Sequence, residues 1–260
     1  LGFKLSRQHS LRFFSEVFDG ERHFSLIRAS ETRTKYDDLN TKNLLEWEYD
    51  FSNFTSIARL AYLEEYYKYF GNLDSDNFSF GKAKTTIAKY DLTYAFSEAL
   101  SINSVLTNTY TLGEGSSLGD NDRNIFSAAV LMKHQLKNEL DYELGFRKEI
   151  TNNYESPFLF SVAASKAFSK HFSLNLSGSR NFRIPTYNDL YWSGAGNAEL
   201  LPEKSLQGQL GASLTIANFN LNLTGYYNSI TDMIRWLPGS DGVWRPQNEE
   251  EVSIYGIESI

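Results

Sequence analysis

The residues that could carry catalytic chemistry are scattered through this chain and form no motif. None of the four histidines belongs to the HExxH pattern of zinc hydrolases; they are His9, His23, His134 and His171. The chain also has no GxSxG nucleophile turn, no glycine-rich phosphate loop and no cysteine. We therefore expect no catalytic residues, no bound cofactor and no protein-built metal centre of the histidine or thiolate type.

Acidic residues come in close pairs within polar stretches of the chain. The pairs are Asp37 with Asp38, Asp74 with Asp76, and Asp120 with Asp122. A hard cation such as calcium needs several oxygen ligands that converge on one point. Two interpretations stay open at this point, a calcium site in these loops or acidic side chains that are simply solvated.

Aromatic residues offer a different kind of chemistry, the binding of a large apolar ligand. Such ligands bind in concave, aromatic-lined pockets with a few polar anchors. Two groups lie at the ends of strands that adjoin the longest polar stretches, and we predict them as ligand-binding residues: Tyr66, Tyr67 and Tyr69 (with Phe70 beside them), and Trp192, Trp236 and Trp244. The alternative is an aromatic girdle at a membrane interface.

The elements that position these residues are strands. Aromatic residues make up 15% of the chain, which favours β structure. Apolar and polar residues alternate over about thirteen stretches of ~10–15 residues, longer than the ~5–6 residues of ordinary globular strands. Short turns are expected at 52–53, 97–98, 137–138, 169–170 and near 218, and long polar connections over 19–40, 71–81, 113–122, 183–205 and 235–246.

Short turns that alternate with long connections are typical of an antiparallel transmembrane β-barrel of an outer membrane. No run of 18 apolar residues is present, so a spanning helix is not expected. The net charge of −7 disfavours a nucleic-acid partner. The apolar residues of each strand should contact outer-membrane lipid, and the polar ones should line a lumen too wide for side chains to fill.

The stretch from Ser179 to Ser205 interrupts this rhythm and carries a family resemblance. It contains RNFRIPTYNDLY (180–191), GN (196–197) and LLPEKS (200–205), and YYNSITDMI (226–234) and YGIE (255–258) follow in order. These blocks resemble TonB-dependent outer-membrane receptors. Their residues are expected to carry the family motif and to order the loop between two strands: Arg183, Pro185, Asp189, Leu190, Asn197, Pro202 and Glu203.

The resemblance implies a 22-stranded barrel, closed by an N-terminal plug domain and powered through a TonB-contacting segment. Residues 1–260 would then form a barrel-domain fragment of about thirteen strands, with the plug outside this chain. The closest likeness is to the smaller receptors that take up ferric siderophores or cobalamin in Gram-negative bacteria, here as a monomer. A passive porin-type channel is the main alternative; a secreted β-solenoid or adhesin and an outer-membrane enzyme are weaker ones.

Overall fold

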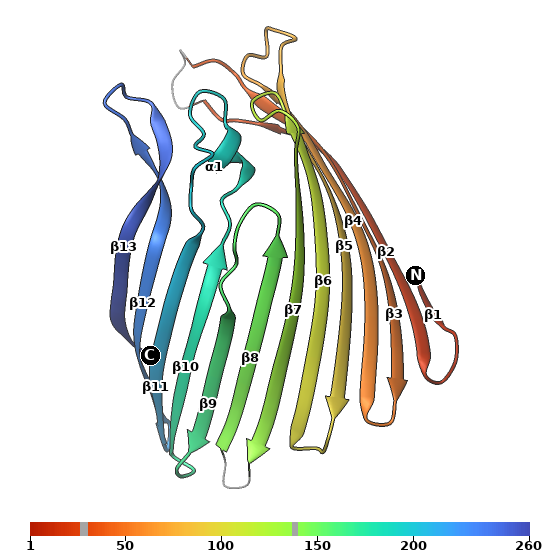
Figure 1. The fold of residues 1–260 in the computed structure, drawn as a ribbon, viewed down its shortest axis with the longest axis vertical. Helices are drawn as coiled ribbons and strands as arrows, with labels where there is room; N and C mark the ends of the chain where they lie inside the picture. The colour runs from red at the N-terminus through yellow and green to blue at the C-terminus, as the bar shows by residue number, and fades with distance from the viewer. Residues whose placement is uncertain (27–30, 137–139) are drawn as a thin grey trace.

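The computed structural model describes residues 1–26, 31–136 and 140–260, and these form a single antiparallel sheet of thirteen strands (Figure 1). Each strand pairs with the next one along the chain, so the sheet is a continuous meander. The strands are β1 (Gly2–Lys4), β2 (His9–His23), β3 (Lys35–Phe51), β4 (Phe54–Phe70), β5 (Ser79–Ala95), β6 (Leu100–Gly115), β7 (Asn121–Leu136), β8 (Leu140–Thr151), β9 (Leu159–Ala167), β10 (Phe172–Arg183), β11 (Glu203–Ile216), β12 (Phe219–Pro238) and β13 (Trp244–Ser259).

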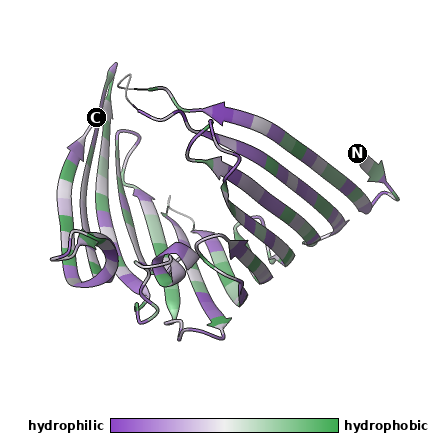
Figure 2. Cartoon of the chain, turned by 90° about the horizontal axis from the view of Figure 1, so that it is seen from above, coloured by the Kyte–Doolittle hydropathy of each residue, from purple (hydrophilic) through white to green (hydrophobic). Residues whose placement is uncertain are grey.

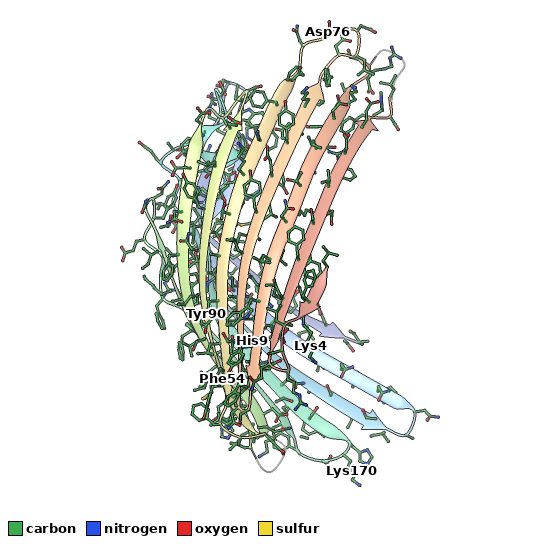
Figure 3. The ribbon with its side chains drawn as sticks, turned by 90° about the vertical axis from the view of Figure 1, so that its right-hand side faces the viewer. Lys4, His9, Phe54, Asp76, Tyr90 and Lys170 are labelled. Atoms are coloured by element: carbon green, nitrogen blue, oxygen red, sulfur yellow. The ribbon has the colours of Figure 1, made fainter. Side chains whose placement is uncertain are left out.

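The sheet curves into an open arc when it is seen from the loop end, and β1 and β13 form its two edges (Figure 2). Short turns lie at one end, where Lys170 is found, and long loops lie at the other, where Asp76 is found (Figure 3). The expected all-β barrel wall and its alternation of turns and loops are confirmed. The turn expected at 137–138 falls outside the described residues.

Two of the expected polar connections are largely strand. The β2–β3 ladder continues as far as the pair His23 and Lys35. Likewise, β12 and β13 continue to Pro238 and from Trp244, and only the tip of this hairpin is a turn. The expectation was wrong because these strand ends lack the alternation of apolar and polar residues. Residues 19–23 are polar on both faces, whereas Ile234, Trp236 and Leu237 place apolar residues on both faces of β12.

The pairing register separates two faces of the sheet. One row of directly paired residues crosses seven strands and is polar throughout: Arg12, Glu46, Arg59, Lys89, Thr107, Ser127 and Glu149. The neighbouring row, on the opposite face, is mostly apolar: Phe13, Leu45, Leu60, Ala88, Asn108, Phe126 and Ile150. We call the first the inner face and the second the outer face.

The inner face is held by a ladder of ion pairs. Glu46 is only 7% exposed and accepts hydrogen bonds from Arg12 at 2.8 Å and from Arg59 at 2.6 Å. Arg59 also donates to Asp91 at 2.7 Å. A carboxylate so poorly solvated is stable only with charged partners of this kind. The inner wall is therefore polar, and these positive and negative side chains neutralise one another.

The outer face has no protein layer over it. Its aromatic residues gather beside the short turns, where Tyr49, Phe51 and Phe54 form mutual ring contacts. Further pairs are Tyr94 with Phe96 and Phe168 with Phe172. Such a row is the arrangement of an aromatic belt at a membrane interface.

The buried hydrophobic core of the described chain has only four residues, Leu159, Leu190, Leu200 and Ile234, because the apolar outer face is left to lipid. Three of them, Leu190, Leu200 and Ile234, form one cluster beneath the loop that joins β10 to β11. This loop contains the single helix of the described chain, α1 (Tyr187–Tyr191). At five residues α1 is far too short to cross a bilayer, and no other part of the described chain offers a helix that could.

Candidate functional site

The loop over residues 184–202 has a defined fold that starts from its own sequence. Pro185 is fully buried, and Thr186, in an extended conformation, begins α1. The Thr186 hydroxyl accepts from the amide N–H of Asp189 at 3.2 Å, and the Asp189 carboxylate accepts from the amide N–H of Thr186 at 2.9 Å. This reciprocal capping box satisfies helix donors that would otherwise be unpaired.

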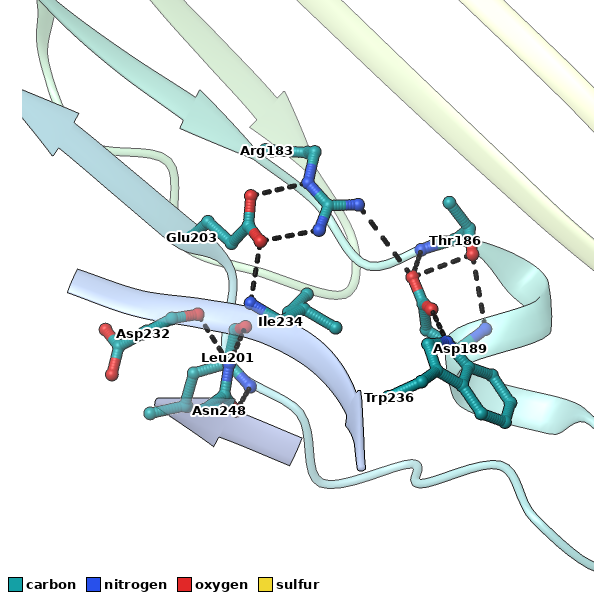
Figure 4. A network of polar contacts seen from close by, with 9 residues as sticks. All are labelled: Arg183, Thr186, Asp189, Leu201, Glu203, Asp232, Ile234, Trp236 and Asn248. Atoms are coloured by element: carbon teal, nitrogen blue, oxygen red, sulfur yellow. Dashed lines mark hydrogen bonds and ion pairs between the residues drawn. The ribbon is translucent and has the colours of Figure 1, made fainter. Parts of the chain in front are cut away.

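Asp189 links the loop to a distant strand as well (Figure 4). The Asp189 side chain is 9% exposed, and its carboxylate accepts two more hydrogen bonds, from the Thr186 hydroxyl at 2.7 Å and from the indole N–H of Trp236 on β12 at 2.9 Å. The guanidinium of Arg183 lies 3.9 Å away. Burial opposes ionisation of Asp189, but the hydrogen bonds from Thr186 and Trp236 outweigh it and hold its pKa below the ordinary value.

Glu203 joins three strands at the same level. It receives a bidentate ion pair from Arg183 on β10, at 2.5 Å and 2.6 Å, and also accepts from the amide N–H of Ile234 on β12 at 2.6 Å. Bidentate arginine–carboxylate pairs are both strong and geometrically specific. Arg183 and Glu203 thus fix the spacing of β10, β11 and β12 where the loop begins and ends.

Asn248 on β13 provides a second attachment for the loop. Its side chain accepts from the amide N–H of Leu201 at 2.8 Å and donates to the carbonyl of Leu201 at 2.9 Å (Figure 4). It also donates to the carbonyl of Asp232 at 2.7 Å. Nearby, the Asn197 amide donates to the carbonyl of Pro246 at 3.4 Å. The C-terminal half of the loop is therefore docked on the β12–β13 hairpin.

The helix also contacts the middle strands of the sheet, β6 and β7. The Tyr187 hydroxyl donates to the carbonyl of Thr111 on β6 at 3.3 Å, and the guanidinium of Arg123 lies 4.9 Å from the Tyr187 ring. A Cβ at Gly113 would lie 2.9 Å from this ring, so only glycine allows the approach. Because Thr111, Gly113 and Arg123 share the inner face, the loop crosses the lumenal side of the mouth rather than standing outside it.

The tyrosines predicted as one ligand-binding group lie on opposite faces. Tyr66 is on the outer face, where Lys68 and Lys82 lie about 6 Å from its ring. Tyr67 and Tyr69 are on the inner face, and both contact the ring of Tyr36. A single aromatic cluster of all three is therefore ruled out by strand alternation.

The inner pair forms part of a larger group that the sequence pattern did not reveal. The ring of Tyr36 lies 5.4 Å from that of Tyr67 and 4.9 Å from that of Tyr69, and the guanidinium of Arg22 lies 5.2 Å from it. Arg22 also donates to Asp38 at 2.6 Å. The signal that could have found Tyr36 is strand alternation, which continues from Thr41 back through the stretch expected to be a polar connection.

The three tryptophans also separate. Trp236 uses its indole N–H within the loop network. Trp192 directly follows α1 and is 42% exposed, and Trp244 at the start of β13 is 57% exposed. Trp192 and Trp244 are thus free to contact a ligand at the mouth, whereas Trp236 has an internal partner.

The sequence matches the family "TonB dependent receptor-like, beta-barrel" over residues 3–259. The chain belongs to this family. Proteins of this family lie in the outer membrane of Gram-negative bacteria. The resemblance seen in residues 180–205 and in the two blocks that follow is therefore confirmed, and the loop over 184–202 is a loop of a TonB-dependent receptor barrel.

Individual relatives are longer than this chain. It is 32% identical over 132 residues to the vitamin B12 transporter BtuB of Vibrio vulnificus, which is 50% of this chain and 22% of that protein. It is 24% identical over 183 residues to BtuB of Photobacterium profundum, covering 68% of this chain and 30% of the relative. The chain therefore spans less than a third of the curated relatives that it matches.

Solved structures share the fold. The siderophore receptor PirA of Pseudomonas aeruginosa superimposes with a TM-score of 0.84 at 13% identity, over 99% of this chain and 51% of that one. The ferric enterobactin receptor PfeA of the same organism, solved in complex with enterobactin, gives a TM-score of 0.77 at 12% identity, over 99% of this chain and 48% of that one. At such identity the likeness establishes the barrel wall alone.

The acidic pairs of the receptor barrel do not converge. Asp37 and Asp38 are neighbours within β3, so they point to opposite faces, and their partners are Lys35 at 3.0 Å and Arg22 at 2.6 Å. Asp74 lies 3.5 Å from a guanidinium, that of Arg33. Across 1–26, 31–136 and 140–260, no group of three or more His, Asp or Glu side chains is placed to hold a metal ion.

Proposed function

We propose that the complete protein is an outer-membrane receptor that imports a scarce metal chelate with energy supplied by the TonB complex. The family match over residues 3–259 is the observation that carries this proposal. In such a receptor the ligand is bound and moved without covalent chemistry, so no catalytic set is needed. Its partners are the chelate, the TonB complex and outer-membrane lipid, with no nucleic acid, and we propose that it acts as a monomer.

Cobalamin is the first candidate ligand among metal chelates, and a ferric siderophore is the second. Relatives found by sequence include vitamin B12 transporters, and one of them shares 32% identity with half of this chain. The siderophore receptors resemble this chain in fold at 12–13% identity, which carries no argument about the ligand.

The mouth geometry is suited to binding a large, partly apolar molecule. The loop is attached to the middle of the sheet through Tyr187 and to the edge strand β13 through Asn248, so its shape is set before a ligand arrives. Preorganisation of this kind lowers the entropy cost of binding. Across from it, the inner-face group of Tyr36, Tyr67 and Tyr69 offers aromatic surface, and we propose these residues with Trp192 and Trp244 as ligand contacts.

Binding to the purified full-length protein tests this proposal. We expect saturable binding of cobalamin, and we expect Trp192→Ala and Tyr67→Ala to weaken it about tenfold each, because a buried aromatic contact contributes about 1–2 kcal/mol. Phe96→Ala, at the opposite end of the barrel, is the matched control and should bind as the unmodified protein does.

The porin-type alternative predicts a different result. A passive channel would show steady open conductance in a planar bilayer and no saturable binding of either chelate. Saturable binding of a ferric siderophore, with no binding of cobalamin, would support the receptor proposal and identify the siderophore as the ligand class. If both chelates fail to bind and the protein conducts, the receptor proposal is wrong.

A further inference from the structure

A hollow lies in the outer face of the wall over β10, β11 and β12. Its floor is made of glycines: Gly178 on β10 is the direct register partner of Gly208 on β11, and Gly225 on β12 lies one row nearer the turns. Leu176 and Leu210 are among the apolar side chains around it. The hollow is a shallow, open depression with a volume of about 770 Å³.

Internal packing does not require these glycines. A Cβ at Gly225 would meet nothing within 4 Å, and a Cβ at Gly208 would come no closer than 3.8 Å to another atom. None of the three has a positive φ. Glycine weakens a strand interior, and where it is not needed by the fold it often marks the close approach of another molecule. The hollow is space that the chain leaves open on its lipid-facing side.

One charged side chain, that of Arg180, lies at the loop-side end of the hollow, between Phe160 and Leu206, which line it. Arg180 is the next outward-facing residue after Gly178 in the direction of the loops. Within the described part of the chain its guanidinium makes no hydrogen bond and no ion pair. Tyr227 on β12 also lines the hollow, and its hydroxyl lies 3.2 Å from the Ser253 hydroxyl on β13. An unpaired cation on the outer face of a membrane barrel costs free energy unless an anion meets it.

We propose that this hollow binds one acyl chain of a phosphorylated glycolipid of the outer leaflet, with the lipid phosphate paired to Arg180. The apolar floor fits hydrocarbon, and the cation on the loop side fits an anionic headgroup at the extracellular interface, where the long loops of such barrels lie. The apolar floor of the hollow and the cation of Arg180 thus follow one another in the same order as the acyl chain and the phosphate of the lipid. The proposal depends on the barrel lying in the outer membrane and not on which chelate it carries.

Lipid titration of the purified full-length receptor tests this assignment. The receptor is delipidated in mild detergent, and bound lipid is counted by native mass spectrometry during titration with bis-phosphorylated lipid A or with its dephosphorylated form. Arg180→Gln removes the cation, and the double variant Gly208→Leu/Gly225→Leu fills the hollow. The matched controls are Lys170→Gln, a cation at the turn end, and Ala88→Leu, an outer-face substitution on β5.

We expect the unmodified receptor to prefer the phosphorylated lipid, and Arg180→Gln to reduce that affinity about tenfold while leaving the dephosphorylated form unaffected. The double glycine variant should lose both lipids, and both controls should keep them. Heat-modifiable migration in gels verifies that each variant is folded. Equal binding of the two lipids, or unchanged binding by the double variant, would overturn the proposal. Loss of an oligomer rather than of lipid in the double variant would also overturn it, in favour of a second receptor copy.

Discussion

Replacing Asp189 with asparagine tests whether the mouth loop is held as the structure indicates. The carboxylate accepts hydrogen bonds from the amide and hydroxyl of Thr186 and from the indole of Trp236, at 2.7–2.9 Å. Asparagine has the same shape but only one oxygen acceptor. Either the bond from the Trp236 indole or the bond from the Thr186 amide must therefore be lost, and one N–H donor is left unsatisfied.

The cost can be worked from these contacts. An unsatisfied buried donor costs about 1–3 kcal/mol. Loss of the charge opposite Arg183, at 3.9 Å and half-exposed, adds about 0–1 kcal/mol. We expect the free energy of loop opening to fall by about 2 kcal/mol, which corresponds to an exchange rate about 30-fold faster for loop amides.

Hydrogen–deuterium exchange of the peptide over residues 184–202, in the full-length receptor, measures this change. Its reporters include the amide of Asn197, which donates to the carbonyl of Asp189 at 2.8 Å. Asp241→Asn is the control, because Asp241 pairs with Arg245 at the exposed tip of the β12–β13 hairpin. A change of less than about threefold in Asp189→Asn, no greater than in the control, would refute the role of Asp189 as the centre of the loop network.

The same carboxylate makes loop docking sensitive to acid, and its titration gives a second prediction. Its pKa is lower in the docked loop than in the open one, so docking is favoured at every pH above the ordinary aspartate value of about 3.9. The stabilisation of the docked loop by the ionised Asp189 carboxylate disappears as the pH falls through the lowered pKa. Loop protection should therefore be constant from about pH 5 to 8 and decrease below about pH 4. In Asp189→Asn the acid-dependent step should be smaller, and the part that remains belongs to Glu203, whose pKa, despite burial, is also held below its ordinary value by hydrogen bonds from Arg183 and Ile234. An undiminished step would contradict the role of Asp189.

Three further changes follow from individual contacts. In Gly196→Ala the new Cβ would lie 2.6 Å from a backbone nitrogen, so the free energy of loop opening in the exchange assay should fall by about 1–3 kcal/mol. In Gly225→Ala the new Cβ would meet no other atom within 4 Å, and loop exchange should be unchanged. Trp236→Phe removes one donor to a buried carboxylate and should raise loop exchange about tenfold without changing heat-modifiable migration. Arg59→Leu breaks two inner-face ion pairs and should lower the free energy of unfolding of the receptor, measured by urea titration, by about 1–3 kcal/mol. Lys133→Leu breaks an exposed pair and should change this free energy by about 0–1 kcal/mol.

The sequence is informative about the wall because the bilayer imposes a period of two on every strand. Apolar residues on one face and polar residues on the other allow the strands and the short turns to be located from the pattern alone. The pattern weakens outside the apolar band, and for that reason the upper ends of β2, β3, β12 and β13 resemble loops in sequence. The opposite orientation of Tyr66 and Tyr67 could have been predicted, since adjacent residues of a strand always face apart.

The fold of the mouth loop could not be read in the same way. Its motif residues indicate the family and a need for internal contacts, but the partners are distant in sequence. Tyr187 meets Thr111, which is 76 residues away, and Asn248 meets Leu201 across 47 residues. Such contacts depend on the curvature of the whole arc, which no local pattern encodes. Trp236 illustrates the result: an aromatic residue predicted to meet a ligand is a hydrogen-bond donor to the loop.

Uptake by cells tests the central claim most directly. A strain that lacks its own cobalamin receptor is supplied with the full-length protein, and accumulation of radiolabelled cobalamin is measured with TonB present and with TonB deleted. We predict saturable accumulation that requires TonB, with a ferric siderophore assayed in parallel as the second candidate. Equal accumulation of both compounds in the two strains, rising in proportion to concentration, would contradict active transport and indicate a passive channel.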